Sequence, residues 1–124
     1  MLLVAFTVND AAVSAYATVE DSAVDEIDRV LQINLHGAIY GMKAALPVMK
    51  RQGGGTIINV SSIAAFRVGS GASDAYTAAK GGVLAMSRSL AVEHAPDGIR
   101  VNCLIPGPIE TPMSEAIPSK NREV

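Results

Sequence analysis

The sequence predicts an α/β fold, a partial Rossmann-like, doubly wound parallel sheet. Three short apolar runs rich in β-branched residues alternate with two longer segments whose apolar residues recur every three or four positions. This alternation is typical of strand–helix–strand units, whose right-handed crossovers place the strands side by side and parallel. We expect the order strand, helix, strand, helix, strand and C-terminal loop, in a single domain spanning residues 1–124.

The first strand is expected from Leu2 to Val8. A long helix should begin at Ser22, because Asp25 three residues later completes a capping-box pattern. The apolar residues of this helix fall on one face: Val24, Ile27, Leu31, Leu35, Ala38, Met42, Ala45 and Met49. Pro47 should kink or tighten the last turns, and Gly53-Gly54-Gly55 should end the helix.

The second half of the chain repeats the pattern. Thr56–Val60 is a continuous β-branched run, as expected of a strand buried on both faces. The Gly- and Ser-rich stretch from Arg67 to Ser73 predicts a loop, and a second helix should run from Asp74 to His94. Ile99–Ile105 is the third expected strand.

The third strand should stop at Pro106-Gly107-Pro108, and the polar remainder to Val124 predicts a loop or a short helix. Ligands of parallel sheets bind beyond the carboxyl ends of the strands. In this sequence those ends are Asn9, Ser61-Ser62 and Pro106-Gly107. The functional residues are therefore expected there.

Composition excludes several classes of protein. Ten basic and twelve acidic residues are scattered along the chain, so no basic patch indicates a nucleic-acid partner. No apolar run is long enough to span a membrane. Cys103 is the only cysteine, which excludes an internal disulfide and favours a reducing, cytoplasmic location. One cysteine with His36 and His94 makes no metal-ligand cluster, and no GxSxG motif indicates a serine hydrolase.

Tyr76 and Lys80 are the residues most suggestive of chemistry. Four positions apart on a predicted helix, they share one face. An ammonium held near a phenol favours the phenolate, so the pair could make an acid/base whose pKa lies nearer neutrality. Ser62, at the end of the neighbouring strand, could hydrogen-bond the substrate oxygen. Alone, this spacing is more typical of a buried aromatic beside a lysine whose stem is buried.

Four motifs in order are far more specific. They are Asn34-Leu-His-Gly37, Ile57-Ile-Asn-Val-Ser-Ser62, Tyr76-Thr-Ala-Ala-Lys80, and Val101-Asn102 followed by Pro106-Gly107-Pro108-Ile-Glu-Thr-Pro-Met113. In this order and spacing the chain, from about Asn9 onward, resembles the short-chain dehydrogenase/reductase family. The resemblance implies an oxidoreductase that interconverts an alcohol and a ketone with NAD or NADP.

The resemblance also implies residue roles. Tyr76 would be the general acid/base, and Lys80 would lower its pKa and hydrogen-bond the nicotinamide ribose. Ser62 would orient the substrate oxygen, and the backbone of Asn34 would help to hold a water in a proton relay. The implied cofactor-binding residues are Asn9, Tyr76, Lys80, Pro106, Gly107, Ile109 and Thr111. No metal site is implied.

The chain departs from the family pattern at its start. No Gly-rich fingerprint precedes Gly37, so the segment that normally approaches the cofactor pyrophosphate is missing from this sequence. We expect the chain to begin at the fourth strand of the family fold and to stop before its last strand. Asp10 and Ala12 replace an asparagine and a glycine of the family. The interval from Ser62 to Tyr76 is one residue longer than is common, which the loop can absorb.

Two functional hypotheses follow. The first is the NAD(P)-dependent enzyme, acting on a small alcohol or ketone; the second is a non-catalytic truncated relative acting at most as an oligomerising fragment. In both cases we expect a homo-oligomer, because Leu2–Val8 would expose an apolar sheet edge without lysine or proline. Small residues on the two helices also permit close approach: Ala38, Ala45, Ala78, Ala79, Gly81 and Gly82.

Overall fold

The sheet has three parallel strands in the order β1-β2-β3. The computed structural model describes residues 3–66 and 73–116. Within them, β1 spans Phe6–Asn9, β2 spans Gly55–Val60 and β3 spans Ile99–Leu104. Ile58 at the centre of β2 lies opposite Val8 on one side and Asn102 on the other. The predicted α/β class and the parallel, Rossmann-like pairing are confirmed.

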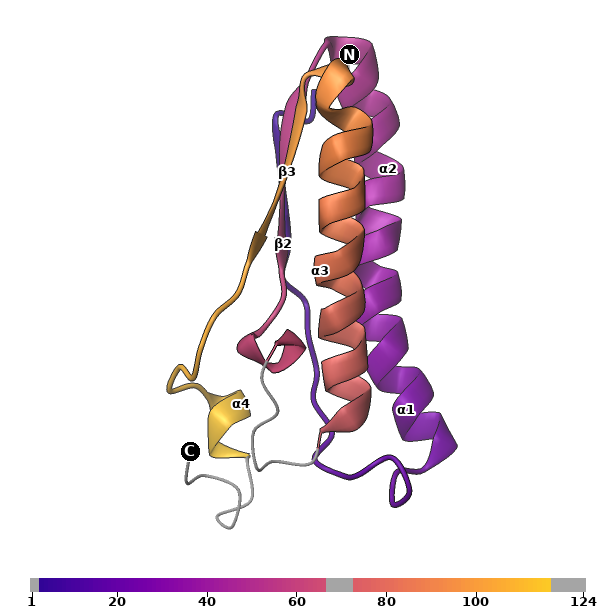
Figure 1. The fold of residues 1–124 in the computed structure, drawn as a ribbon, viewed down its shortest axis with the longest axis vertical. Helices are drawn as coiled ribbons and strands as arrows, with labels where there is room; N and C mark the ends of the chain where they lie inside the picture. Colours follow the sequence, from indigo (N-terminus) through magenta and orange to yellow (C-terminus); the bar gives the residue numbers. More distant parts are fainter. Residues whose placement is uncertain (1–2, 67–72, 117–124) are drawn as a thin grey trace.

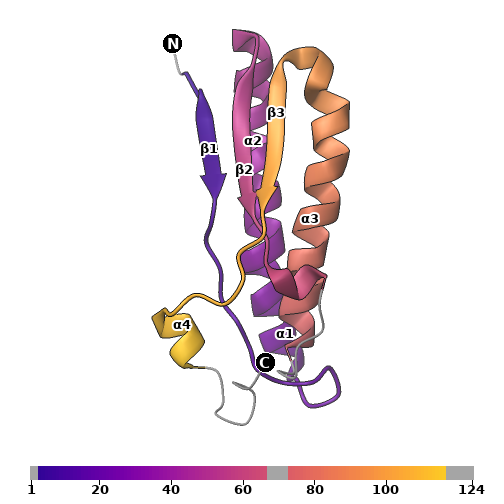
Figure 2. The same ribbon diagram turned by 60° about the vertical axis from the view of Figure 1, so that its left-hand side comes forward.

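Two long helical segments connect the strands. The first comprises α1 (Val24–Leu31), the π-helix η1 (Gln32–His36) and α2 (Gly37–Gln52), and the second is α3 (Asp74–His94). Shorter pieces are η2 (Ile63–Ala65), η3 (Ala95–Asp97) and α4 (Pro112–Glu115). Figures 1 and 2 show α2 and α3 side by side on one face of the sheet, and α4 beyond the strand ends.

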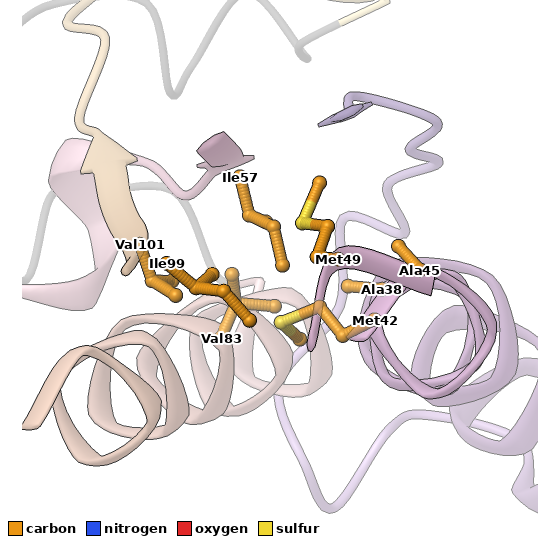
Figure 3. Packing of buried hydrophobic residues seen from close by; sticks show 8 residues of the cluster. All are labelled: Ala38, Met42, Ala45, Met49, Ile57, Val83, Ile99 and Val101. Carbon is orange, nitrogen blue, oxygen red and sulfur yellow. The ribbon is translucent and has the colours of Figure 1, made fainter. Parts of the chain in front are cut away.

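The core lies between the sheet and these two helices. Figure 3 shows side chains from both helices and from two strands meeting there: Ala38, Met42, Ala45, Met49, Ile57, Val83, Ile99 and Val101. Met42, Met49 and Ile57 are at most 1 % exposed. Truncating such a methionine to alanine costs about 2–5 kcal/mol in comparable cores. The expected helix face from Ala38 to Met49 is therefore the face that builds the core.

The two turns at the amino ends of β2 and β3 pack against each other. Gly53 and Gly98 have positive φ angles of 87° and 71°, a conformation that favours glycine. A Cβ on Gly54 would lie 2.7 Å from the carbonyl oxygen of Gly98. This close approach aligns the starts of β2 and β3, and so sets their carboxyl ends level with each other.

Several expected boundaries are corrected. β1 begins at Phe6 and includes Asn9, and β3 ends at Leu104. The capping box at Ser22 is wrong: the Ser22 hydroxyl donates to the Thr18 carbonyl, and Ala23 precedes the helix without a side-chain cap.

Other predicted elements are placed as follows. Pro47 lies inside α2, which continues to Gln52, and α3 has the predicted bounds. The loop from Arg67 to Ser73 lies outside the described residues except for its last residue, as do the first residue of the expected first strand and residues 117–124. No helix in the described residues is both long and apolar enough to cross a membrane.

The other face of the sheet carries no helix among the described residues (Figure 2). Successive strand side chains point to opposite faces, so the residues that alternate with buried Ile57 and Asn59 belong to this second face. Phe6, Val8 and Leu104 are 57 %, 49 % and 53 % exposed. The described part of the chain thus presents an uncovered apolar sheet surface bordered by the free edge of β1.

Candidate active site

A cavity of about 600 Å³ opens where the three strands end. It is lined by alternate residues from Asp10 to Tyr16, by the last residue of β2 and the four that follow it, by residues at the start of α3, and by most of residues 106–114. Parallel sheets bind ligands at this edge. The cavity brings together most of the predicted site residues: Ser62, Tyr76, Lys80, Pro106, Gly107, Ile109 and Thr111.

The two serines after β2 have different roles. Ser61 is buried, and its hydroxyl donates to the Lys80 backbone carbonyl at 2.8 Å, so it ties the end of β2 to α3. Ser62 faces the cavity and caps η2, its Oγ accepting from the Ala64 amide at 3.2 Å. The hydroxyl predicted to orient a substrate oxygen is therefore held at the rigid end of the central strand.

Tyr76 and Lys80 lie one turn apart on α3, as the spacing predicts. The Lys80 Nζ lies 5.7 Å from the centre of the Tyr76 ring. It also donates to the Val60 carbonyl at 2.8 Å, and the lysine is only 2 % exposed. A buried ammonium with one backbone acceptor keeps further donor capacity. Lys80 is thus positioned between the end of β2 and the phenol.

The pKa of Tyr76 is shifted by three effects that differ in direction. Burial raises the pKa of Tyr76, and the nearby Tyr16 hydroxyl adds to the rise, whereas a hydrogen bond with Ser62 acts in the opposite direction. Desolvation of the phenolate is the largest of these effects, so the net direction is opposite to the lowering that the Tyr-Lys spacing predicts. A raised pKa favours the neutral phenol form of Tyr76.

Lys80 is shifted in the complementary direction. Burial lowers the pKa of Lys80, and the Asp10 carboxylate and Cys103 partly offset that effect. Desolvation penalises the ammonium because few polar groups replace its water. Asp10, which departs from the family pattern, is therefore a counter-charge for the buried lysine.

Asn34 sits in the π-helix η1 and is 2 % exposed. Its side chain forms two hydrogen bonds with the Val13 backbone: Oδ1 accepts from N at 2.8 Å, and Nδ2 donates to O at 2.6 Å. π-Helical turns are frequent at functional sites. Because both side-chain polar groups are occupied, any part of Asn34 in a proton relay falls to its backbone. Asn34 also lines a neighbouring cavity of about 180 Å³ shared with Lys80.

Asn9 is directed away from the large cavity. Its Nδ2 donates to Asn59 Oδ1 at 2.7 Å, and Asn59 Nδ2 donates to Ser87 Oγ at 2.9 Å. Asn9 lines only the smaller cavity. Its side chain therefore links β1 to β2 and, through Asn59, to α3, and a cofactor contact from Asn9 would have to come from its backbone.

Thr111 lines the large cavity and also begins α4. Its Oγ1 accepts from the Ser114 amide at 3.3 Å, while Ser114 Oγ accepts from the Thr111 amide at 2.9 Å. This is a reciprocal capping arrangement. The hydroxyl that the resemblance assigns to a cofactor phosphate is thus engaged in holding α4 in place.

Tyr16 and Met113 are among the cavity-wall residues that sequence reasoning did not assign to the site. The Tyr16 hydroxyl donates to the Met113 carbonyl at 3.0 Å, and both residues line the cavity. An aromatic residue a few positions beyond a strand end was a usable signal, since that edge binds ligands. Nothing in the spacing indicated that Tyr16 would meet a residue so distant in sequence.

The lining residues fit one half of a nicotinamide cofactor. Lys80 offers a buried hydrogen-bond donor beside Tyr76. A Cβ built on Gly107 would have no atom within 4 Å, so there is space next to the Gly107 backbone. Among the described residues, no glycine-rich turn joins the carboxyl end of a strand to a helix, as a pyrophosphate site requires. The same residues contain no cluster of three or more potential metal ligands from His, Cys, Asp and Glu.

Comparison with known proteins gives a consistent result. Residues 3–124 match the family model described as Enoyl-(Acyl carrier protein) reductase. The chain is 42 % identical over 111 residues to 3-alpha-(or 20-beta)-hydroxysteroid dehydrogenase of Mycobacterium tuberculosis. Among solved structures, it superposes with a TM-score of 0.87 and 36 % identity on a protein from Burkholderia xenovorans described as a short-chain dehydrogenase/reductase, covering 90 % of this chain and 42 % of that one.

An NAD+-bound xylitol dehydrogenase is also similar, with a TM-score of 0.80 and 37 % identity over 85 % of this chain and 40 % of that structure. The match to the mycobacterial dehydrogenase covers 90 % of this chain and 42 % of that protein. The chain therefore spans less than half the length of the relatives that it matches.

Proposed function

The chain belongs to the short-chain dehydrogenase/reductase family of oxidoreductases, and we propose that it contributes a Ser62-Tyr76-Lys80 site that interconverts an alcohol and a ketone with NAD or NADP. The observation that carries this proposal is the meeting of these three side chains in one cavity at the carboxyl edge of the sheet. Among the described residues that line this cavity, Lys80 is the only cationic side chain, and its Nζ lies 5.7 Å from the centre of the Tyr76 ring.

The cofactor, when bound, would supply the hydride transfer. Lys80 would hold its ribose, Pro106, Gly107 and Ile109 would contact its nicotinamide, and Thr111 would lie toward a phosphate. The similarity to an NAD+-bound xylitol dehydrogenase supports a nicotinamide cofactor without distinguishing NAD from NADP.

The protein groups supply the proton. In the reducing direction, the carbonyl carbon of the ketone receives the hydride, and the neutral Tyr76 hydroxyl donates its proton to the carbonyl oxygen. Ser62 hydrogen-bonds the same oxygen and stabilises the charge that develops on it. In the oxidising direction each transfer is reversed, so Tyr76 must first release its proton, and its raised pKa makes that step pH-dependent.

Lys80 would then serve in two ways. Its charge lies beside the Tyr76 ring and stabilises the phenolate as the proton leaves. It also lines both the large cavity and the smaller one that contains Asn34. A proton delivered to Lys80 through the smaller cavity could therefore reach Tyr76 without crossing the substrate, which supports a relay role for the Asn34 backbone.

The second candidate is a non-catalytic relative that acts at most as an oligomerising fragment. The uncovered sheet face and the absence of a pyrophosphate turn among the described residues favour it. Cofactor binding discriminates the two. An isolated 124-residue chain with only the nicotinamide half of the site should bind NAD or NADP no more tightly than about 1 mM, near −4 kcal/mol. Calorimetric titration measures this directly, and a micromolar constant would contradict the assignment of half a site.

We further propose a cytoplasmic location, because a chain with the single cysteine Cys103 cannot form an internal disulfide.

The function itself is tested by following the absorbance of reduced nicotinamide with secondary alcohols at saturating cofactor. Oxidation that requires Ser62 and Tyr76 supports the proposal. Absence of turnover in both directions, with either cofactor and with a cofactor-binding signal present, would refute it.

A further inference from the structure

Tyr16 has no role in the chemistry described above, yet it forms part of the same cavity as Ser62 and Tyr76. It lies between β1 and α1, and its hydroxyl donates to the Met113 carbonyl of α4 at 3.0 Å. These residues are 97 positions apart in sequence. The contact therefore joins the segment after the first strand to the segment after the last, across the strand ends.

The segment that carries Tyr16 is anchored to the site. The Ser73 hydroxyl donates to the Ala15 carbonyl at 2.9 Å, and the Asp74 carboxylate accepts from the Val19 amide at 2.8 Å. Ser73 immediately precedes α3, and Asp74 is its first residue, two positions before Tyr76. These bonds tie the backbone on both sides of Tyr16 to the start of α3. The influence of Tyr16 on the pKa of Tyr76 is consistent with the proximity of the two side chains.

The chemistry of the cavity wall limits what can bind beside the reacting centre. Among the described lining residues, only Asp10 and Lys80 carry charge. The Lys80 ammonium lies beside the Tyr76 ring and already donates a hydrogen bond to the Val60 carbonyl. A substrate carboxylate or phosphate would need its own cationic partner. The remaining wall is largely apolar: Ala12, Ile63, Ala64, Pro108, Ile109 and Met113. Such a wall suits an uncharged organic group.

We propose that Tyr16 and Met113 are specificity-determining residues that receive the uncharged, apolar body of the alcohol or ketone, whose oxygen is held by Ser62 and Tyr76. This inference rests on the proposed function. The tie between Tyr16 and the Met113 carbonyl sets the size of the space, because it fixes α4 relative to the segment after β1. Hydrophobic pockets discriminate substrates by about tenfold or more per lost apolar group.

Three secondary alcohols test the proposal at saturating cofactor: cyclohexanol, isopropanol, and lactate, which replaces one methyl group of isopropanol by a carboxylate. The unmodified protein should have the highest kcat/KM for cyclohexanol, and the value for lactate should lie at least about tenfold below that for isopropanol. Tyr16→Ala and Met113→Ala should each reduce the cyclohexanol-to-isopropanol ratio about tenfold. Tyr16→Phe keeps the ring but loses the hydrogen bond to the Met113 carbonyl, so it should reduce that ratio, by less than Tyr16→Ala does. Tyr40→Ala on the exposed face of α2 should change nothing.

A second measurement does not depend on cofactor or turnover. In nuclear magnetic resonance spectra, cyclohexanone should shift the Tyr16 ring and Met113 methyl signals and leave those of Tyr40 unchanged. Oxidation of the neutral alcohols with an unchanged ratio in Tyr16→Ala, or oxidation of lactate as fast as isopropanol, would overturn this inference and leave the proposed function intact. Shifts at Tyr40 in place of Tyr16 would overturn it as well. Absence of oxidation of all three alcohols would overturn both.

Discussion

The Lys80 ammonium donates to the Val60 carbonyl at 2.8 Å, so a charged side chain of α3 binds the last residue of the central strand. Its Nζ lies 5.7 Å from the centre of the Tyr76 ring. The strand backbone thus fixes the ammonium beside the phenol. This geometry gives Lys80 both a structural and a chemical role, which can be separated by mutation.

Lys80→Met tests that double role. Methionine keeps much of the side-chain volume but leaves the Val60 carbonyl without its donor, which should lower the free energy of unfolding by about 1–3 kcal/mol. Turnover should fall further than this stability loss explains, because the phenolate of Tyr76 loses its neighbouring charge. Urea unfolding and nicotinamide absorbance measure the two effects. Lys43→Met, at an exposed position of α2, is the matched control and should leave both unchanged.

Gly41→Ala tests the packing of β1 against α2. A Cβ at Gly41 would overlap the Asn9 side-chain oxygen and would lie 3.2 Å from Asn9 Cγ. Asn9 cannot move without losing its bond to Asn59, so we expect destabilisation of about 1–3 kcal/mol. In contrast, a Cβ at Gly81 in α3 meets nothing within 4 Å.

Gly81→Ala is therefore the control. It should stabilise the protein by up to about 1 kcal/mol through helix propensity alone. Urea denaturation of the two variants under one buffer gives the comparison. Equal stability of Gly41→Ala and Gly81→Ala would show that Asn9 is not held in the position described.

Asp97 predicts a pH dependence of stability. A hydrogen bond from His94 and the charge of Lys50 hold the pKa of Asp97 below its ordinary value. A carboxyl whose pKa is lower in the folded state stabilises the fold above the unfolded-state pKa, about 3.9, and loses this contribution as the pH falls through the folded-state value. Asp97→Asn should therefore reduce the free energy of unfolding at neutral pH and have little effect at strongly acidic pH.

Chemical denaturation at several pH values measures this difference. Asp28→Asn, which replaces an exposed carboxylate of α1, should show no comparable trend. A constant difference between Asp97→Asn and the unmodified protein across the acidic range would contradict the role given to the His94–Asp97 contact.

The uncovered sheet face predicts self-association. Phe6 and Val8 are 57 % and 49 % exposed on β1, whose outer edge has no partner strand among the described residues. Exposed apolar edges commonly pair with other chains, so the isolated chain should form oligomers at tens of micromolar, an order-of-magnitude range. Val8→Lys should shift light scattering toward monomer, whereas Val24→Lys on α1 should not. A monodisperse monomer of the unmodified chain over a dilution series would contradict the prediction.

The sequence predicted most of the fold because its periodicities are strong. The β-branched run Thr56–Val60 and the apolar spacing of Asp74–His94 gave β2 and α3 almost to the residue. Boundaries set by competing hydrogen bonds were less predictable. The Ser22 hydroxyl donates to the Thr18 carbonyl and does not cap the first turn of the helix. The spacing of residues does not distinguish these two hydrogen bonds.

The site was predictable to the level of its motifs. Ser62, Tyr76 and Lys80 meet as the ordered motifs imply, since parallel strands bring their carboxyl ends together. The direction of side chains was not predictable. Asn9 turns toward Asn59 because Gly41 leaves space for it, and the raised pKa of Tyr76 depends on burial that exists only in the folded chain.

The most direct measurement is the turnover of Tyr76→Phe with a secondary alcohol at saturating NAD or NADP. Only the proton-transferring hydroxyl is removed, so turnover should fall by about 10²–10⁴-fold while circular dichroism shows an unchanged fold. Tyr40→Phe, which alters a 63 % exposed tyrosine on α2, should retain full turnover. Equal activity of Tyr76→Phe and the unmodified protein would contradict the assignment of this cavity as the catalytic site.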